Sequence, residues 1–157
     1  METTTKEKTE KIISQLNNLV EINNDRIQGY ERAITENEDT ELDHLFITMA
    51  SHSKTNKLDL SREITLLGGT PTEGTKTSGK LFRLWMDIKA SLTGKNKQEI
   101  LASCEFGEHA ALETYDAVLA DDDQILTEQL KRLIQSQKQD ILSDHDRIKT
   151  LREVVKN

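Results

Sequence analysis

The sequence is poor in the residues that build turns, disulfides and aromatic cores. Its 157 residues include one proline, seven glycines and one cysteine, and only 4% of them are aromatic. So few turn-forming residues disfavour a β fold of many strands, and the lone Cys104 cannot form an internal disulfide. Its apolar neighbours Ile100 and Leu101 favour a buried, unreactive thiol over a reactive one.

Long apolar runs are missing as well. No stretch reaches the roughly 18 apolar residues of a membrane span, and the first residues contain no apolar segment typical of a secretory signal. The chain has 21 basic and 28 acidic side chains, a net charge of −7, which disfavours general affinity for nucleic acids. We therefore expect a cytoplasmic protein that binds neither membranes nor nucleic acid.

What the sequence does contain is apolar residues at helical spacing. The pattern predicts long helices over residues 8–37, 41–67 and 122–155. A further segment divides into a short helix over about 80–92 and a longer one over 96–119. The first two long helices, and the last two, are joined by short polar links, which predicts two antiparallel hairpins.

The connection between the two hairpins is longer and differs in composition. Residues 68–79 hold four of the seven glycines and the only proline, without a phosphate-binding glycine motif. A connector of this length suits a crossover along the bundle. The sequence thus predicts an all-α, ferritin-like four-helix bundle that forms a single domain over residues 1–157.

Polar residues interrupt the expected apolar stripes of the helices. Asn23 lies on the stripe of the first helix, four residues from both Leu19 and Ile27. Glu108 occupies the same kind of position on the helix over 96–119. Because chemistry in a bundle resides where polar side chains face the core, we expect a buried polar layer made of Asn23, Asn56, Glu108 and Gln137.

Such a layer is where ferritin-like di-iron proteins place four glutamates and two histidines. Here only Glu108 and His52 match that set, and the other positions hold Asn23, Met49, Ile134 and Gln137. The sequence therefore lacks a complete di-iron site, and we predict no cofactor. Two interpretations stay open: a structural layer that supplies the hydrogen bonds a buried carboxyl needs, or a single transition-metal ion bound by Glu108 and His52.

Other polar and aromatic residues lie outside this predicted polar layer. Glu105 and His109 lie at the edge of the stripe, where they could join a site but fit boundary positions better. Trp85, the only tryptophan, lies in the short amphipathic helix and could cover one end of the bundle or contact a second subunit. We expect a homo-oligomer, with a dimer as the simplest case.

Several short motifs together resemble a known family. They are Asp25-x-x-x-Gly29-Tyr30, Leu67-Gly68-Gly69-Thr70-Pro71, Gly107-Glu108 with Tyr115, and His145-Asp146-x-Ile148. The chain is similar to the bacterial four-helix-bundle domain of unknown function, a family classed as ferritin-like. The resemblance implies a cytoplasmic bacterial protein without an established activity, and it brings no catalytic residues with it.

The resemblance does single out Asp25, Tyr30 and His145 as candidates for whatever the family does. Asp25 lies opposite the apolar stripe of its helix, so it could instead brace the crossover. Taken together, the sequence favours a non-enzymatic bundle that acts by association with itself or a partner. The alternative is a metal-binding ferritin-like protein that uses Glu108 and His52.

Overall fold

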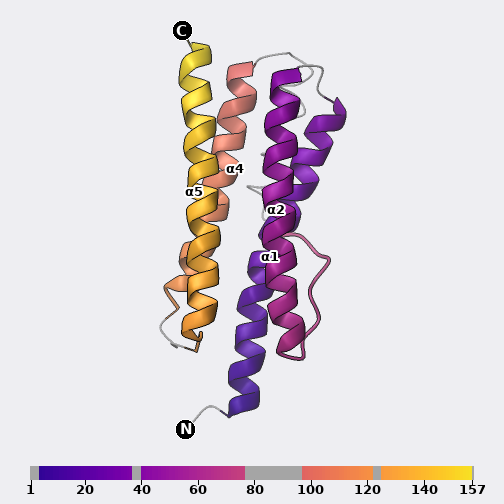
Figure 1. The fold of residues 1–157 in the computed structure, drawn as a ribbon, viewed down its shortest axis with the longest axis vertical. Helices are drawn as coiled ribbons and strands as arrows, with labels where there is room; N and C mark the ends of the chain where they lie inside the picture. Colours follow the sequence, from indigo (N-terminus) through magenta and orange to yellow (C-terminus); the bar gives the residue numbers. More distant parts are fainter. Residues whose placement is uncertain (1–3, 37–39, 77–96, 122–124, 157) are drawn as a thin grey trace.

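The computed structural model of the chain describes residues 4–36, 40–76, 97–121 and 125–156. They form four α-helices, labelled in Figure 1: α1 (Thr5–Glu36), α2 (Thr40–Leu66), α4 (Lys97–Leu119) and α5 (Glu128–Lys156). The described residues contain no strand, so the predicted all-α four-helix bundle is confirmed. The short helix predicted over residues 80–92, which includes Trp85, lies outside the described residues.

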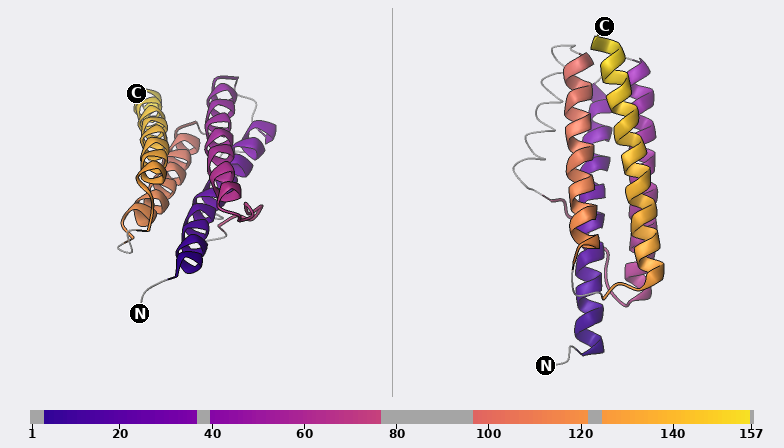
Figure 2. Two further views of the ribbon diagram at one scale, coloured as in Figure 1. Left: turned by 60° about the horizontal axis from the view of Figure 1, so that its bottom comes forward. Right: turned by 90° about the vertical axis from the view of Figure 1, so that its left-hand side faces the viewer.

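The helices pair as two hairpins. α1 packs against α2 and α4 packs against α5, while α1 also contacts α4. α1 runs up the bundle and α2 runs down, then α4 runs down and α5 returns upward, so that the two chain ends lie at opposite ends of the bundle (Figure 1). Figure 2 shows the two hairpins side by side. The end of α2 and the start of α4 therefore lie at opposite ends of the bundle (Figure 1).

Two threonines cap the N-terminal ends of helices. The Thr4 hydroxyl accepts a hydrogen bond of 3.1 Å from the Glu7 amide at the start of α1, as a helix cap does. The Thr127 hydroxyl does the same for the Leu130 amide at 3.2 Å, at the start of α5. The predicted start of this last helix at Asp122 is wrong, because α5 begins at Glu128 after that cap.

α2 ends in a pair of glycines that turn the chain. Gly68 has a φ of 87°, a left-handed conformation that glycine adopts without steric cost. The Gly68 amide donates to the Thr65 carbonyl at 3.0 Å and the Gly69 amide to the Ile64 carbonyl at 2.9 Å, which completes a Schellman motif. A Cβ atom on Gly69 would lie 2.8 Å from Cγ2 of Ile13 on α1, so only glycine allows this close approach.

The described part of the crossover then follows α1. The Asn17 side chain donates to the Thr70 carbonyl at 3.2 Å and accepts from the Thr72 amide at 2.9 Å. Two helical turns further along α1, the Asn24 side chain donates to the Gly74 carbonyl at 2.8 Å. Polar residues on the outer side of α1 thus satisfy the backbone of a segment that has no secondary structure of its own.

The core combines apolar side chains from all four helices. The members with no exposed surface include Leu16, Leu19, Phe46, Met49, Leu60, Leu101, Ile134, Ile141 and Ile148. One residue departs from the predicted pattern: Ile27 was placed on the stripe of α1, but it is only partly buried, while its neighbour Arg26 is 1% exposed. None of the described helices is long and apolar enough to span a membrane.

Candidate functional site

Arg26 lies at the centre of a buried group of charges. Its Nη2 is 2.9 Å from Oε2 of Glu108 on α4 and 3.4 Å from Oδ2 of Asp144 on α5. Its Nε and Nη2 also donate hydrogen bonds to Oε1 of Glu108, at 3.3 and 3.1 Å. All three side chains are buried. A single guanidinium on α1 therefore ties the first hairpin to both helices of the second.

Glu108 receives a further bond from Tyr30. The Tyr30 hydroxyl donates to Oε1 of Glu108 at 2.5 Å, so this oxygen accepts from two residues of α1. The other oxygen, Oε2, has no hydrogen-bond donor and is held by the charge of Arg26. The buried carboxylate of Glu108 is thus stabilised mainly by the charge of Arg26 and the hydroxyl of Tyr30.

The charges change how the neighbouring groups ionise. Burial is the largest single influence on the Arg26 guanidinium and would lower its pKa, but the charge and hydrogen bond of Glu108, together with Tyr30 and Tyr115, outweigh it and raise that pKa. Burial and the same carboxylate raise the pKa of Tyr30 well above its usual value, so the hydroxyl keeps the proton it donates. Burial, together with Glu108, also raises the pKa of Cys104, which makes the thiol unreactive.

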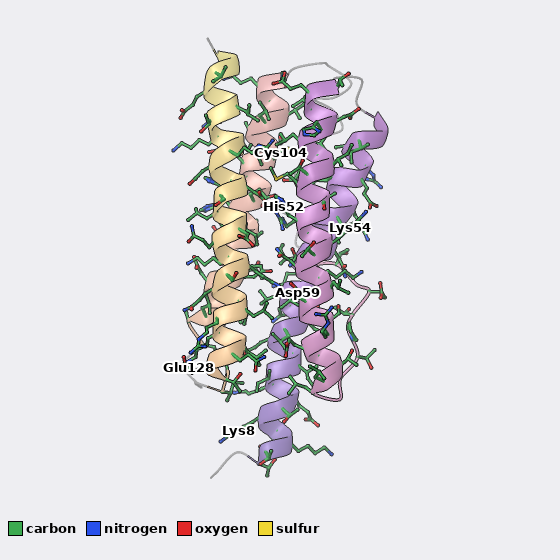
Figure 3. All side chains as sticks on the ribbon, viewed as in Figure 1. Lys8, His52, Lys54, Asp59, Cys104 and Glu128 are labelled. Carbon is green, nitrogen blue, oxygen red and sulfur yellow. The ribbon has the colours of Figure 1, made fainter. Side chains whose placement is uncertain are left out.

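His52 extends this group toward the surface. Its Nδ1 lies 2.9 Å from both carboxylate oxygens of Asp144, and its side chain is 46% exposed. Figure 3 shows His52 on the side of α2 that faces the second hairpin. The contact connects α2 to α5, so all four helices contribute to the charged group.

Next to the charges lies a closed ring of four neutral residues, one from each helix, in which Asn56 takes part with both its backbone carbonyl and its side-chain amide. The Asn23 amide donates to the Tyr115 hydroxyl at 2.9 Å, and this hydroxyl donates to Oε1 of Gln137 at 2.7 Å. The Gln137 amide donates to the Asn56 carbonyl at 3.2 Å, and the Asn56 amide donates to Oδ1 of Asn23 at 3.5 Å. Arg26 joins the two groups, because its Nη1 donates to the same Asn23 oxygen at 3.0 Å.

The structure brings the four residues of the predicted polar layer into this network. Asn23, Asn56, Glu108 and Gln137 are all buried, and hydrogen bonds connect them directly or through Arg26 and Tyr115. The partners of Glu108 differ from those expected, since Arg26 and Tyr30 contact it. His52 contacts Asp144.

Arg26 is not among the core residues predicted from the sequence. A signal was present: Arg26 is three residues after Asn23 and four before Tyr30, both of which lie on the apolar stripe. A charged residue in phase with two buried neighbours needs a buried counter-charge, and Glu108 was already assigned to the core. Asp144 likewise lies at helical spacing from Ile141 and Ile148, but nothing in the sequence pairs it with Arg26.

Asp25, the next residue along α1, has a different role. It is 6% exposed, and its Oδ2 accepts a hydrogen bond of 3.1 Å from the Lys76 amide of the crossover. Burial raises the pKa of Asp25 to about 7, although the bond from Lys76 opposes the shift. This is the contact that the bracing interpretation of Asp25 predicts.

His145 lies away from the centre, at the outer junction of α4 and α5. Its Nδ1 is 3.1 Å from Oδ1 of Asp146, and its Nε2 is 3.8 Å from Oε1 of Glu105. Arg152 donates to the other oxygen of Glu105 at 2.6 Å. The ring of His109 is 6.5 Å from that of His145, between centroids. These residues form a second, partly exposed polar cluster.

The donor set at the centre does not fit a pair of iron ions. A di-iron site needs several carboxylates that face one another across a shared cation position. Here the guanidinium of Arg26 lies between Glu108 and Asp144 and takes that position. In the described parts of the chain, no group of three or more His, Cys, Asp or Glu side chains could hold a metal ion as placed.

The molecule is thus an all-α four-helix bundle with a closed polar and charged network at its centre. Residues 11–121 match the family profile described as Domain of unknown function (DUF2383), and the chain belongs to that family. The match includes Arg26 and Glu108, whereas the network residues Gln137 and Asp144 of α5 follow it in the sequence. No curated protein matches the chain.

Proposed function

We propose that this chain is a non-enzymatic, ferritin-like bundle of the bacterial cytoplasm that acts by association with a second copy of itself. The observation that carries the proposal is the position of Arg26 between Glu108 and Asp144. In this proposal the network fixes the register of the four helices, and the outer surface of the bundle binds the second copy.

The charge balance supports a structural role for the centre. A divalent ion placed between Glu108 and Asp144 would come within a few ångströms of the buried guanidinium, where like charges repel strongly. Arg26 cannot release this charge, because its pKa is raised above the already high value of free arginine. Arg26 serves as the internal cation that metals supply in di-iron bundles.

The outer face of α2 supports association. Ile47 and Leu58 are 53% and 58% exposed, and they lie eleven residues apart, which is close to three full helical turns. Ser51 and Lys54 lie between them on the same exposed stripe. We propose this outward face of α2, defined by these four residues, as the surface that meets the second copy.

Sedimentation velocity over a range of protein concentrations tests the proposal. The wild-type chain should show a reversible dimer, and the double substitution Ile47→Glu with Leu58→Glu should weaken it at least about tenfold, because two charges would be buried in the contact. Gln135→Glu, which adds a charge to the exposed surface of α5, is the matched control and should leave the dimer intact. A chain that stays monomeric throughout, or a dimer that is insensitive to the double substitution, contradicts the proposal.

One observation keeps a single-metal site at Glu108 and His52 as a second candidate function. Oε2 of Glu108 is buried and lacks a hydrogen-bond donor, which would suit a ligand oxygen. Elemental analysis of protein purified without chelators tests this candidate. A stoichiometric transition metal that is lost in both Glu108→Gln and His52→Ala would favour it over the structural role.

A further inference from the structure

The cluster at the outer junction of α4 and α5 has the donor atoms that transition metals prefer. His109 and Glu105 lie one helical turn apart on α4, and His145 faces them from α5. Neutral imidazole and carboxylate are ligands for zinc, copper and nickel. Two histidines and one glutamate from two helices are also a common way to build a small metal site in a helical bundle.

His145 and Glu105 are the best-placed pair. Nε2 of His145 and Oε1 of Glu105 are 3.8 Å apart, and a zinc ion that binds both at about 2.0–2.2 Å would fit between them. The other oxygen of Glu105 accepts the bond from Arg152, which holds the carboxylate in place and leaves Oε1 facing the histidine. The His145 side chain is 18% exposed, so its position is largely set by packing.

The second nitrogen of His145 has the support that a metal-bound histidine needs. Its Nδ1 lies 3.1 Å from Oδ1 of Asp146, so the Nδ1–H tautomer is favoured and Nε2 keeps its lone pair for a metal. This carboxylate–histidine arrangement recurs around protein-bound zinc, where it orients the ring and raises its basicity. The orientation of His145 is therefore already suited to coordination.

His109 would supply the third donor once its exposed side chain rotates toward His145, because no three such side chains among the described residues are placed to hold a metal ion as they stand. Two imidazoles on one ion have centroids about 5–6 Å apart, and those of His109 and His145 are 6.5 Å apart. The His109 side chain is 61% exposed and contacts only the equally exposed Glu113 among the described ion pairs. Rotation toward His145 thus breaks one solvent-exposed pair, a contact of small energy.

The local charge also favours a cation. Glu105, Glu113 and Asp146 carry three negative charges against the one positive charge of Arg152. We propose that Glu105, His109 and His145 form a surface site for one divalent transition-metal ion, with Asp146 as the positioning residue behind His145. The site is separate from the buried network around Arg26, and it would fasten α4 to α5.

Titration of the untagged, full-length chain with Zn²⁺ or Ni²⁺, followed by calorimetry and thermal unfolding, tests the site. We expect one equivalent to bind and to raise the melting temperature, since a ligand of the folded state stabilises it. His109→Ala and His145→Ala should each weaken binding at least about tenfold, and Asp146→Asn should weaken it by a smaller factor. His44→Ala removes an exposed histidine from the other hairpin and is the matched control, with unchanged binding.

His109 is exposed, so His109→Ala should fold like the wild type and keeps the test decisive even if His145→Ala does not fold. NMR of the histidine rings provides a second readout: zinc should shift the signals of His109 and His145 and leave that of His44 in place. The proposal is overturned if zinc fails to bind at millimolar concentration, or if His109→Ala binds it as tightly as the wild type. Binding that instead disappears in His52→Ala would locate the metal at the other candidate site and would also overturn it.

Discussion

The most informative perturbation of this bundle is the removal of its internal cation. Arg26→Met keeps a long, flexible side chain of similar reach but leaves Glu108 and Asp144 in the core without a positive charge. Loss of one partner from a buried ion pair costs about 3–5 kcal/mol, because the remaining charge stays desolvated. The expected fall in the free energy of unfolding is of that size, a large part of the roughly 5–15 kcal/mol that stabilises an ordinary domain.

The second substitution in this test is Glu108→Gln. It removes the charge that Arg26 chiefly compensates but leaves Arg26 with Asp144, 3.4 Å away, so we expect a smaller loss of about 1–3 kcal/mol. The double variant should lose clearly less than the sum of the two single losses, because Arg26 and Glu108 no longer leave each other unpaired and only Asp144, which still contacts His52, loses a partner. A coupling free energy of about 2 kcal/mol is expected for residues in direct contact.

Urea-induced unfolding followed by far-ultraviolet circular dichroism measures all three variants at neutral pH. Arg62→Met is the control, because it removes an exposed arginine from α2 and should change stability by less than about 0.5 kcal/mol. A loss of less than about 1 kcal/mol in Arg26→Met, or single effects that add to within about 0.5 kcal/mol, would show that Arg26 does not compensate these carboxylates.

Three further substitutions test other parts of the structure. Burial raises the pKa of Asp25 from 3.8 to about 7, so the stability it contributes is present below pH 4 and is lost as the pH rises to 7. Asp25→Asn should therefore gain up to about 4 kcal/mol relative to wild type across that range, measured by urea unfolding at several pH values. Gly69→Ala should cost about 1–3 kcal/mol through the clash with Ile13, and the cost should disappear in an Ile13→Ala background, measured by the same unfolding assay. Tyr115→Phe removes the hydroxyl that donates to Gln137 and should cost about 1–3 kcal/mol by leaving buried polar groups unpaired, measured as a lower melting temperature.

Each of these tests has a contradicting outcome. A stability difference between Asp25→Asn and wild type that does not change with pH would show that Asp25 does not titrate near 7. If Gly69→Ala remains costly when Ile13 is an alanine, the close approach of crossover and helix is not the cause. A Tyr115→Phe chain that melts at the wild-type temperature would show that the ring of polar side chains contributes no stability.

The sequence predicted most of the architecture because apolar spacing and turn residues act locally. Regular placement of residues such as Leu16, Leu19 and Leu101 at helical intervals is sufficient to locate a helix and the face it buries. The start of α5 was misplaced because the acidic residues before Thr127 resemble the first turn of a helix, and a cap threonine is a weaker signal than an acidic run.

The centre of the bundle was harder to predict because its partners are far apart in the sequence. Arg26 and Glu108 are separated by 82 residues, and Arg26 and Asp144 by 118. A single charged residue on a helix is usually exposed. The sequence pattern therefore assigned Ile27 to the buried face of α1, where the structure places Arg26. Helical phase places a residue on a face, but it does not say which charge from another helix lies opposite.

The central claim is that the cation in the middle of this bundle belongs to the protein. Anomalous X-ray diffraction from crystals grown with excess manganese or iron tests it most directly, because the scattering locates a metal independently of the density for side chains. We expect a guanidinium between Glu108 and Asp144, within hydrogen-bonding distance of Oε1 of Glu108, and no anomalous peak at that position. A metal peak coordinated by Glu108, with Arg26 turned out of the core, would contradict it.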